Sequence, residues 1–147
     1  MAIQVTKVSS KKDMKTFVRF GNKLYKGNKY YVPSMPMDDM ATFDATHNGA
    51  FVFSEAELYL AYKDGQVVGR VAAIINKKAN EAWGVNQVRF GWIDFIDDME
   101  VSGALLDAVI EFGRKRGMTQ IVGPLGFTDF DPEGMLVEGY DRISTMA

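Results

Sequence analysis

The sequence predicts one mixed α/β domain built around a single sheet, and three observations carry this prediction. The chain has 147 residues, within the range of roughly 100–200 residues that is usual for one domain. Two β-type runs meet at Lys63-Asp64-Gly65, and Asp-Gly between apolar runs is a strong hairpin signal. A strand, a helix of about 18 residues and a second strand follow over 88–123, which is the pattern of a parallel crossover connection.

The first third of the chain is predicted to contain a short strand and a long helix. Residues 3–8 alternate apolar and polar side chains, as a half-buried strand does. Ser9 or Ser10 can cap the helix that follows, and Gly27 is placed to end it. The apolar stripe of this helix consists of Met14, Phe17, Phe20 (or Val18) and Leu24. Pro33 and Pro36 then favour an extended passage, followed by a short helical turn or loop around residues 38–49.

The second half is predicted to alternate between strands and one long helix. Residues 77–86 are read as a polar loop, and residues 88–96 as a strand antiparallel to the hairpin. Asp97 or Asp98 caps a helix that ends at Gly117. Residues 119–123 are predicted to form a buried strand parallel to 88–96. The tail, rich in glycine and aspartate, is read as an ordered loop.

Composition excludes several kinds of site. The chain has no cysteine and one histidine, His47, which excludes disulfides, thiolate metal sites and multi-histidine metal sites. No apolar run is long enough to cross a membrane, and the N-terminus lacks the apolar core of a signal peptide. We therefore expect a cytoplasmic protein without a metal and without a membrane or nucleic-acid partner.

Charge is distributed unevenly along the chain. Residues 1–37 carry eight lysines and arginines but one acid, whereas residues 94–141 carry eleven acids and three bases. The favoured interpretation is a solvated helix face, which could complement the acidic part of another copy. The alternative is a basic patch that attracts a nucleotide, a coenzyme or nucleic acid.

Four segments carry a resemblance to a known family. They are LYKGNKYYVPSM (24–35), LAYKDGQVVGRVAAIIN (60–76), FGWIDFIDD (90–98) and IVGPLGFTDFDPEGMLVEGYD (121–141). With the order of elements, they resemble the GNAT superfamily of acyl-coenzyme A N-acetyltransferases. More narrowly, they resemble the N-terminal portion of a longer, uncharacterised group of bacterial acetyltransferase-like proteins. The resemblance implies a mixed sheet of GNAT type and transfer of an acyl group from acetyl-coenzyme A, or another acyl-coenzyme A, to a small-molecule amine.

The resemblance also implies where the coenzyme and the base would lie. The strand at 88–96 would hold the pantetheine arm by its backbone, and the following helix would hold the pyrophosphate at its N-terminus. The coenzyme-binding positions are then Ile93, Phe95, Ile96, Val101, Ser102, Gly103 and Ala104. Asp94, or a water held by it, would take the proton of the amine. The favoured interpretation of Asp94, from the alternation of the strand, is nevertheless a carboxylate on a solvated strand face that points away from Ile93 and Phe95.

The sequence departs from the family pattern in two ways. Asp98, Glu100 and Ser102 stand where the superfamily has the glycines of its coenzyme turn, and Gly103 is one residue out of register. Carboxylates at this turn would repel a pyrophosphate, so we expect a degenerate coenzyme site. The alternative function is a non-catalytic, GNAT-like ligand-binding or interaction module.

The second departure concerns length. The chain is expected to form one GNAT-like domain over residues 1–147 that lacks the usual last helix and two strands. Either the sequence is a fragment of a longer protein, or a partner chain completes the sheet. An open, apolar edge strand is a liability, so we expect a homodimer or other self-association.

Three further candidates are weaker. Glu57, at the start of the hairpin, is a second candidate base. His47 is placed on the surface, with nothing nearby in sequence to orient it. The run from Asp129 to Gly134 resembles the start of a calcium loop, but the favoured interpretation is an Asx-turn-rich loop whose carboxylates bond backbone N–H groups.

Overall fold

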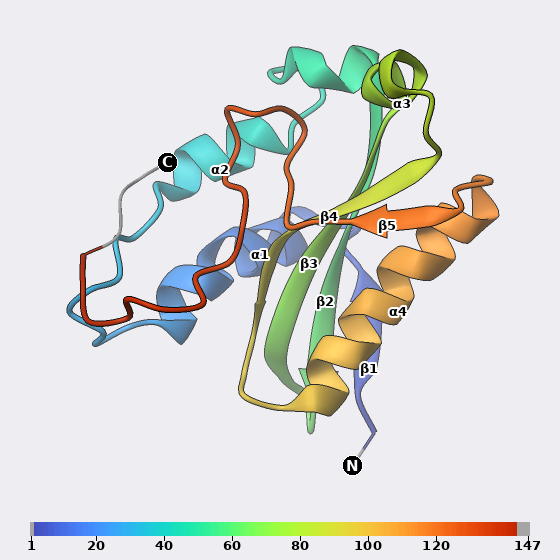
Figure 1. The fold of residues 1–147 in the computed structure, drawn as a ribbon. Helices are drawn as coiled ribbons and strands as arrows, with labels where there is room; N and C mark the ends of the chain where they lie inside the picture. Colours follow the sequence, from blue (N-terminus) through green and yellow to red (C-terminus); the bar gives the residue numbers. More distant parts are fainter. Residues whose placement is uncertain (1, 144–147) are drawn as a thin grey trace.

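A five-stranded sheet with the order β1-β2-β3-β4-β5 forms the centre of the computed structural model, which describes residues 2–143 (Figure 1). Its strands are β1 (Gln4–Lys7), β2 (Ser54–Lys63), β3 (Gln66–Asn76), β4 (Gln87–Phe95) and β5 (Gln120–Val122). Neighbours among the first four strands are antiparallel, and β5 runs parallel to β4. The predicted mixed α/β sheet, its hairpin and its parallel crossover are therefore confirmed.

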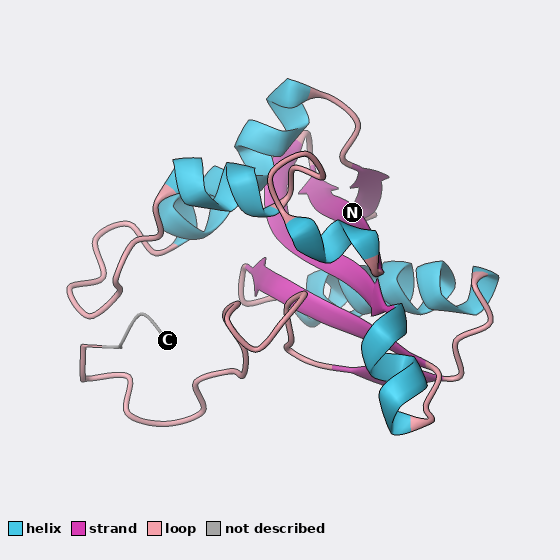
Figure 2. Ribbon diagram, turned by 90° about the horizontal axis from the view of Figure 1, so that it is seen from above, coloured by secondary structure: helices cyan, strands magenta, loops and turns pink. Residues whose placement is uncertain are grey.

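Helices cover both faces of this sheet (Figures 1 and 2). They are α1 (Lys11–Leu24), α2 (Pro36–Thr42), α3 (Lys77–Trp83) and α4 (Met99–Lys115), with a 3₁₀ turn at η1 (Gly49–Val52). α4 packs on one face, whereas α1 and α2 lie on the other. Within residues 2–143, no helix combines the length and the apolar character needed to cross a bilayer.

Each face of the sheet has its own apolar core. On the α4 face, the inward side chains of the strands pack against Val101, Leu105, Val109 and Phe112. On the α1 face, they pack against Phe17, Val18, Phe43 and Phe127. Because successive strand residues point to opposite faces, β3 supplies apolar side chains to both cores.

Caps and turns fix several ends of these elements as the sequence predicts, but the first helix ends at Leu24, with Tyr25 as its C-cap, and not at Gly27. The Ser10 hydroxyl accepts a hydrogen bond from the Asp13 N–H at the start of α1, and Asp98 does the same for Glu100 at the start of α4. Asp64 and Gly65 both have positive φ (+53° and +75°), as a type I′ hairpin turn requires of its two central residues.

The polar loop predicted over residues 77–86 is wrong, because residues 77–83 form α3. The Asn76 side chain caps this helix by accepting the Ala79 N–H, and Gly84 ends it in the left-handed conformation. A helix of seven residues has too few turns to show apolar periodicity, so the polar composition masked it.

A strand does form within residues 119–123, but the prediction that it is buried is wrong. Only residues 120–122 pair with β4, and Gln120 and Ile121 are exposed. β5 is short and forms the edge of the described sheet, so its outer side has no neighbouring strand.

Candidate functional site

β4 carries an irregularity at its centre. Arg70 of β3 faces Asp94 and Ala72 faces Gly91, so Trp92 and Ile93 together face a single residue of β3. This is a β-bulge. Trp92 takes the left-handed conformation (φ +46°), which costs a residue with a side chain of the order of 1–3 kcal/mol.

The outer edge of β4 is open beyond this bulge. β5 pairs with β4 over Gln87–Arg89, and the Leu125 N–H donates to the Phe90 carbonyl at 2.9 Å. The crossing is close, since the Leu125 oxygen leaves no room for a Cβ at Gly91. Past that point, no strand in the described part of the chain pairs with residues 92–95 on this side.

Asp94 lies in this open stretch, where two donors hold its side chain. Arg70 donates to one carboxylate oxygen through Nε at 2.9 Å and lies 2.8 Å from it through Nη2. The Tyr25 hydroxyl donates to the other oxygen at 2.9 Å. Arg70 also donates to the Phe17 carbonyl at 2.8 Å. Gly21 admits this guanidinium, because a Cβ there would lie 2.7 Å from Arg70 Nη2.

A second set of side chains extends this network through the segment between α1 and α2. Tyr31 donates to Asn22 Oδ1 at 2.8 Å, and Asn22 bonds both the N–H and the carbonyl of Ser34. The Ser34 hydroxyl donates to Asp39 at 2.7 Å. We call the whole set the Asp94 network; its members are Asn22, Tyr25, Tyr31, Ser34, Asp39, Arg70 and Asp94.

Burial shifts the titration of this network. Burial first, and the charge of Asp94 second, raise the pKa of Tyr25 and of Tyr31. Burial also raises the pKa of Asp39 above its ordinary value. At neutral pH both phenols therefore stay protonated and act as hydrogen-bond donors.

The structure changes the description of Asp94. The solvated strand face considered for it is wrong, because its side chain is only 18% exposed and is bonded to Arg70 and Tyr25. Neither partner was predicted from the sequence. A signal for Arg70 was present, since it is a lone charge in an otherwise apolar strand, but Tyr25 lies 69 residues away from Asp94.

The N-terminus of α4 is capped by the carboxylate of Asp98, the residue that precedes the helix. Asp98 accepts the Glu100 N–H at 2.9 Å, and Lys63 lies 3.1 Å from its other oxygen. The N–H groups of Val101 and Ser102 donate to the Asp98 carbonyl. Asp98 therefore accepts, through its carboxylate and its carbonyl, the backbone donors where the sequence resemblance places a pyrophosphate.

The residues predicted to bind coenzyme lie on the α4 side. Ile93, Phe95 and Ile96 pack against the core beneath α4, and Val101 is fully buried in it. Ser102 donates its hydroxyl to the Met99 carbonyl, while Gly103 is exposed and Ala104 is half-buried. The Asp94 side chain contacts α1 on the opposite face, so only the β4 backbone joins the two predicted groups.

Glu57 does not lie with Asp94. Its carboxylate is on the α4 face, 3.0 Å from Lys7 and 3.4 Å from Arg116, and it accepts the Tyr59 hydroxyl. These donors and charges lower its pKa against the opposing effect of burial, which is the largest single influence.

His47 has two partners that were not predicted from the sequence. It is exposed, as predicted, but its Nδ1 lies 2.9 Å from Asp44 and 3.0 Å from the Thr46 hydroxyl. The expectation that nothing nearby in sequence orients this ring is therefore wrong.

Asp131 holds the loop that follows β5. Its carboxylate accepts the N–H groups of Phe127 and Thr128 at 2.8 and 3.1 Å. This confirms the predicted bonding of a carboxylate to backbone N–H groups, but the bonds run back along the chain and do not form an Asx turn. Across residues 2–143, the structure holds no group of three or more histidine or acidic side chains arranged to bind a metal.

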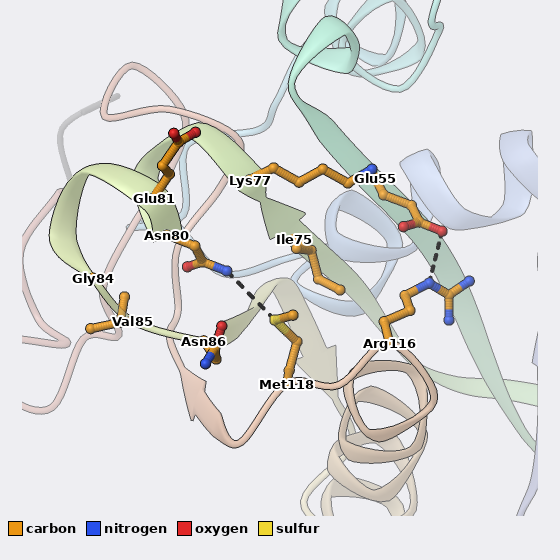
Figure 3. A pocket seen from close by; sticks show the side chains of 10 residues that line it. All are labelled: Glu55, Ile75, Lys77, Asn80, Glu81, Gly84, Val85, Asn86, Arg116 and Met118. Atoms are coloured by element: carbon orange, nitrogen blue, oxygen red, sulfur yellow. Dashed lines mark hydrogen bonds and ion pairs between the residues drawn. The ribbon is translucent and has the colours of Figure 1, made fainter.

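A cavity of about 670 Å³ lies away from the Asp94 network (Figure 3). It lies between α3 and the C-terminal end of α4, with Ile75 and Met118 among its apolar residues. Glu55 and Arg116 form an ion pair of 2.7 Å at its side. None of the residues predicted to bind coenzyme lines this cavity.

Two proteins of known sequence are similar to this chain. Protein YghO of Escherichia coli (strain K12) is 32% identical over 133 residues, which cover 90% of this chain and 34% of that protein. A bacterial ceramide synthase of Caulobacter vibrioides (strain NA1000 / CB15N) is 28% identical over 140 residues, covering 95% of this chain and 36% of that protein. The chain thus spans about a third of the length of these relatives. No protein-family model matches it.

Three solved structures share its arrangement of elements. A tandem GNAT protein from the clavulanic acid biosynthesis pathway has a TM-score of 0.60 at 12% identity, covering 81% of this chain and 35% of that one. A "predicted acetyltransferase" with acetyl-CoA from Clostridium acetobutylicum has a TM-score of 0.56 at 13% identity, covering 82% of this chain and 79% of that one. An aminoglycoside acetyltransferase from an uncultured soil metagenomic sample has a TM-score of 0.54 at 19% identity, covering 83% of this chain and 78% of that one.

Proposed function

The chain has the fold of the GNAT acetyltransferases, and from that premise we propose that it transfers an acyl group from acyl-coenzyme A to an amine. The observation that carries the proposal is the open outer edge of β4 at residues 92–95, beside the bulge and the Asp94 network. An extended ligand with amide groups can add to such an edge as a further strand does. The pantetheine arm of coenzyme A is a ligand of this kind.

The chemistry requires positioning and the removal of one proton. The amine nitrogen attacks the thioester carbonyl carbon, the carbon–sulfur bond breaks, and the coenzyme leaves as a thiolate that takes up a proton. We assign the proton released by the amine to Asp94, directly or through a water that it holds. Tyr25 uses one acceptor site of Asp94 Oδ1, which leaves another on the same atom. Tyr25 and Arg70 are positioning residues, because they act through Asp94.

The acceptor is proposed to be an amine on the evidence of fold and relatives together. One relative is named a bacterial ceramide synthase, and a ceramide is the amide of a long-chain amine. A small-molecule amine acceptor, the homodimer and the cytoplasmic location remain predictions. The non-catalytic binding module remains the second candidate, because Asp98 lies at the N-terminus of α4 where the resemblance places a coenzyme phosphate.

Calorimetric titration with acetyl-coenzyme A tests the coenzyme half of this proposal. We expect saturable binding, and release of free thiol when amines are supplied. Asp94→Asn keeps the size of the side chain but removes its basicity, so it should slow thiol release at least tenfold with coenzyme affinity unchanged. Circular dichroism melting of the variant checks that it folds. Absence of heat at millimolar acetyl-coenzyme A would refute the transferase and leave the binding module.

A second variant tests whether the turn before α4 is degenerate. Asp98→Ser keeps an N-cap oxygen but removes the carboxylate and frees Lys63. We expect acetyl-coenzyme A to bind several-fold more tightly to this variant. Asp107→Ser is the matched control, because Asp107 is exposed in the middle of the same helix. Equal affinities of the Asp98 variant and the unmodified chain would show that the phosphates do not approach this turn.

A further inference from the structure

The segment that follows α1, together with the first two residues of α2, carries two lysines and no acid and exposes large apolar side chains. We call these residues, 26–37, the docking loop. Its charges are Lys26 and Lys29, and no acid occurs from residue 14 to residue 37. Met35 is 66% exposed and Met37 is 83% exposed. In both ribbon views the segment joining α1 and α2 projects away from the sheet (Figures 1 and 2).

The outer face of α1 leads into this loop with more positive charge. Lys12, Lys15, Arg19 and Lys23 line a groove of about 470 Å³ with Thr16, Phe20 and Val67. Within residues 2–143, none of these four cations forms an ion pair. Like charges three or four residues apart on a helix repel by about 0.2–0.5 kcal/mol per pair. The described part of the fold therefore maintains a strip of positive charge that an external anion would neutralise.

The same segment builds the Asp94 network. Tyr25 precedes the docking loop, while Tyr31 and Ser34 belong to it. A surface bound by the loop would consequently lie next to the side chains that surround Asp94.

We propose that the docking loop and the basic face of α1 bind the surface of a membrane that contains anionic lipids. Cations near such a surface contribute about 1 kcal/mol each, and exposed methionines can enter the apolar layer beneath the headgroups. The first acid beyond the loop is Asp38, at the start of α2. The sequence excluded a spanning segment and predicted no membrane partner; our proposal departs from the second prediction because Met35 and Met37 are exposed in the folded chain.

A nucleic acid is a less suitable partner for this basic surface than an anionic membrane. Binding of single strands uses exposed aromatic rings for stacking. Phe20 in the groove is only 5% exposed, and Lys29 lies over the Tyr30 ring at 4.9 Å. The membrane proposal does not depend on acyl transfer, so either can fail without the other.

Co-sedimentation with vesicles tests the proposal. The chain should sediment with vesicles of phosphatidylglycerol mixed with phosphatidylcholine, and much less with phosphatidylcholine alone. The double variant Lys26→Glu with Lys29→Glu should lose at least about tenfold in affinity. The double variant Met35→Ser with Met37→Ser should weaken binding severalfold and leave its salt dependence unchanged.

Matched variants test whether binding depends on this surface, and not simply on the net charge of the chain or on any exposed methionine. Lys77→Glu with Lys78→Glu makes the same change of charge on α3, and Met99→Ser removes a methionine that is 86% exposed at the start of α4. Both should bind vesicles as the unmodified chain does. The proposal would be overturned if the chain showed no preference for anionic vesicles, or if the Lys77 and Lys78 control lost as much affinity as the Lys26 and Lys29 variant. It would also be overturned if the chain bound an RNA oligonucleotide more tightly than vesicles and the methionine substitutions left that binding unchanged.

Discussion

Replacing Arg70 with methionine is expected to lower the free energy of unfolding by about 3–5 kcal/mol, because it leaves a largely buried carboxylate without its ion-pair partner. Asp94 would keep only the Tyr25 bond, and the Phe17 carbonyl would lose its donor. The guanidinium also lies 5.3 Å from the Phe17 ring, so packing is lost together with charge. Urea denaturation followed by circular dichroism measures the change.

Two comparisons make this expectation specific. Arg114→Met removes a guanidinium whose side chain is 73% exposed and only 3.7 Å from Glu111, so it should change stability by less than about 1 kcal/mol. Adding Asp94→Asn to Arg70→Met removes the stranded charge and should restore part of the loss. Purely additive losses in the double variant would show that the two side chains do not stabilise each other.

Replacing Phe127 with alanine is expected to destabilise the chain by about 3–5 kcal/mol, because it removes a fully buried aromatic side chain. Its ring lies 4.9 Å from Phe51, 6.1 Å from Trp92 and 6.2 Å from Phe43. It thus joins the segment after β5 to the bulge of β4 and to the elements around α2. Loss of the ring should also loosen that segment, which hydrogen exchange at the Leu125 amide would detect.

The same loop offers a matched control for this variant. Phe130 is three residues further on and 99% exposed, so Phe130→Ala should alter stability by no more than about 0.5 kcal/mol. Comparable losses in the two variants would contradict the assigned role of Phe127 in the core.

Elements whose signal is local were predictable from the sequence. The Asp64-Gly65 turn, the caps at Ser10 and Asp98 and the apolar stripe of α1 each depend on residues a few positions apart. The crossover from β4 to β5 followed from the length of the connecting helix. α3 was missed, because its seven residues are held by a cap at Asn76 and a stop at Gly84 rather than by an apolar stripe.

Apart from α3, the sequence alone thus determined the order of elements, the mixed sheet and the placement of Asp94 on its fourth antiparallel strand, since periodicity and turn chemistry are properties of neighbouring residues. Only the tertiary structure decided that Asp94 is enclosed by Tyr25 and Arg70, that β4 bulges at Trp92 and that its outer edge opens there. Hydrogen bonds between residues 24 and 69 positions apart leave no periodic trace in a sequence. The bond between Arg70 and Asp94 follows from the pairing of β3 with β4, and the bond between Tyr25 and Asp94 follows from the packing of α1 against the sheet.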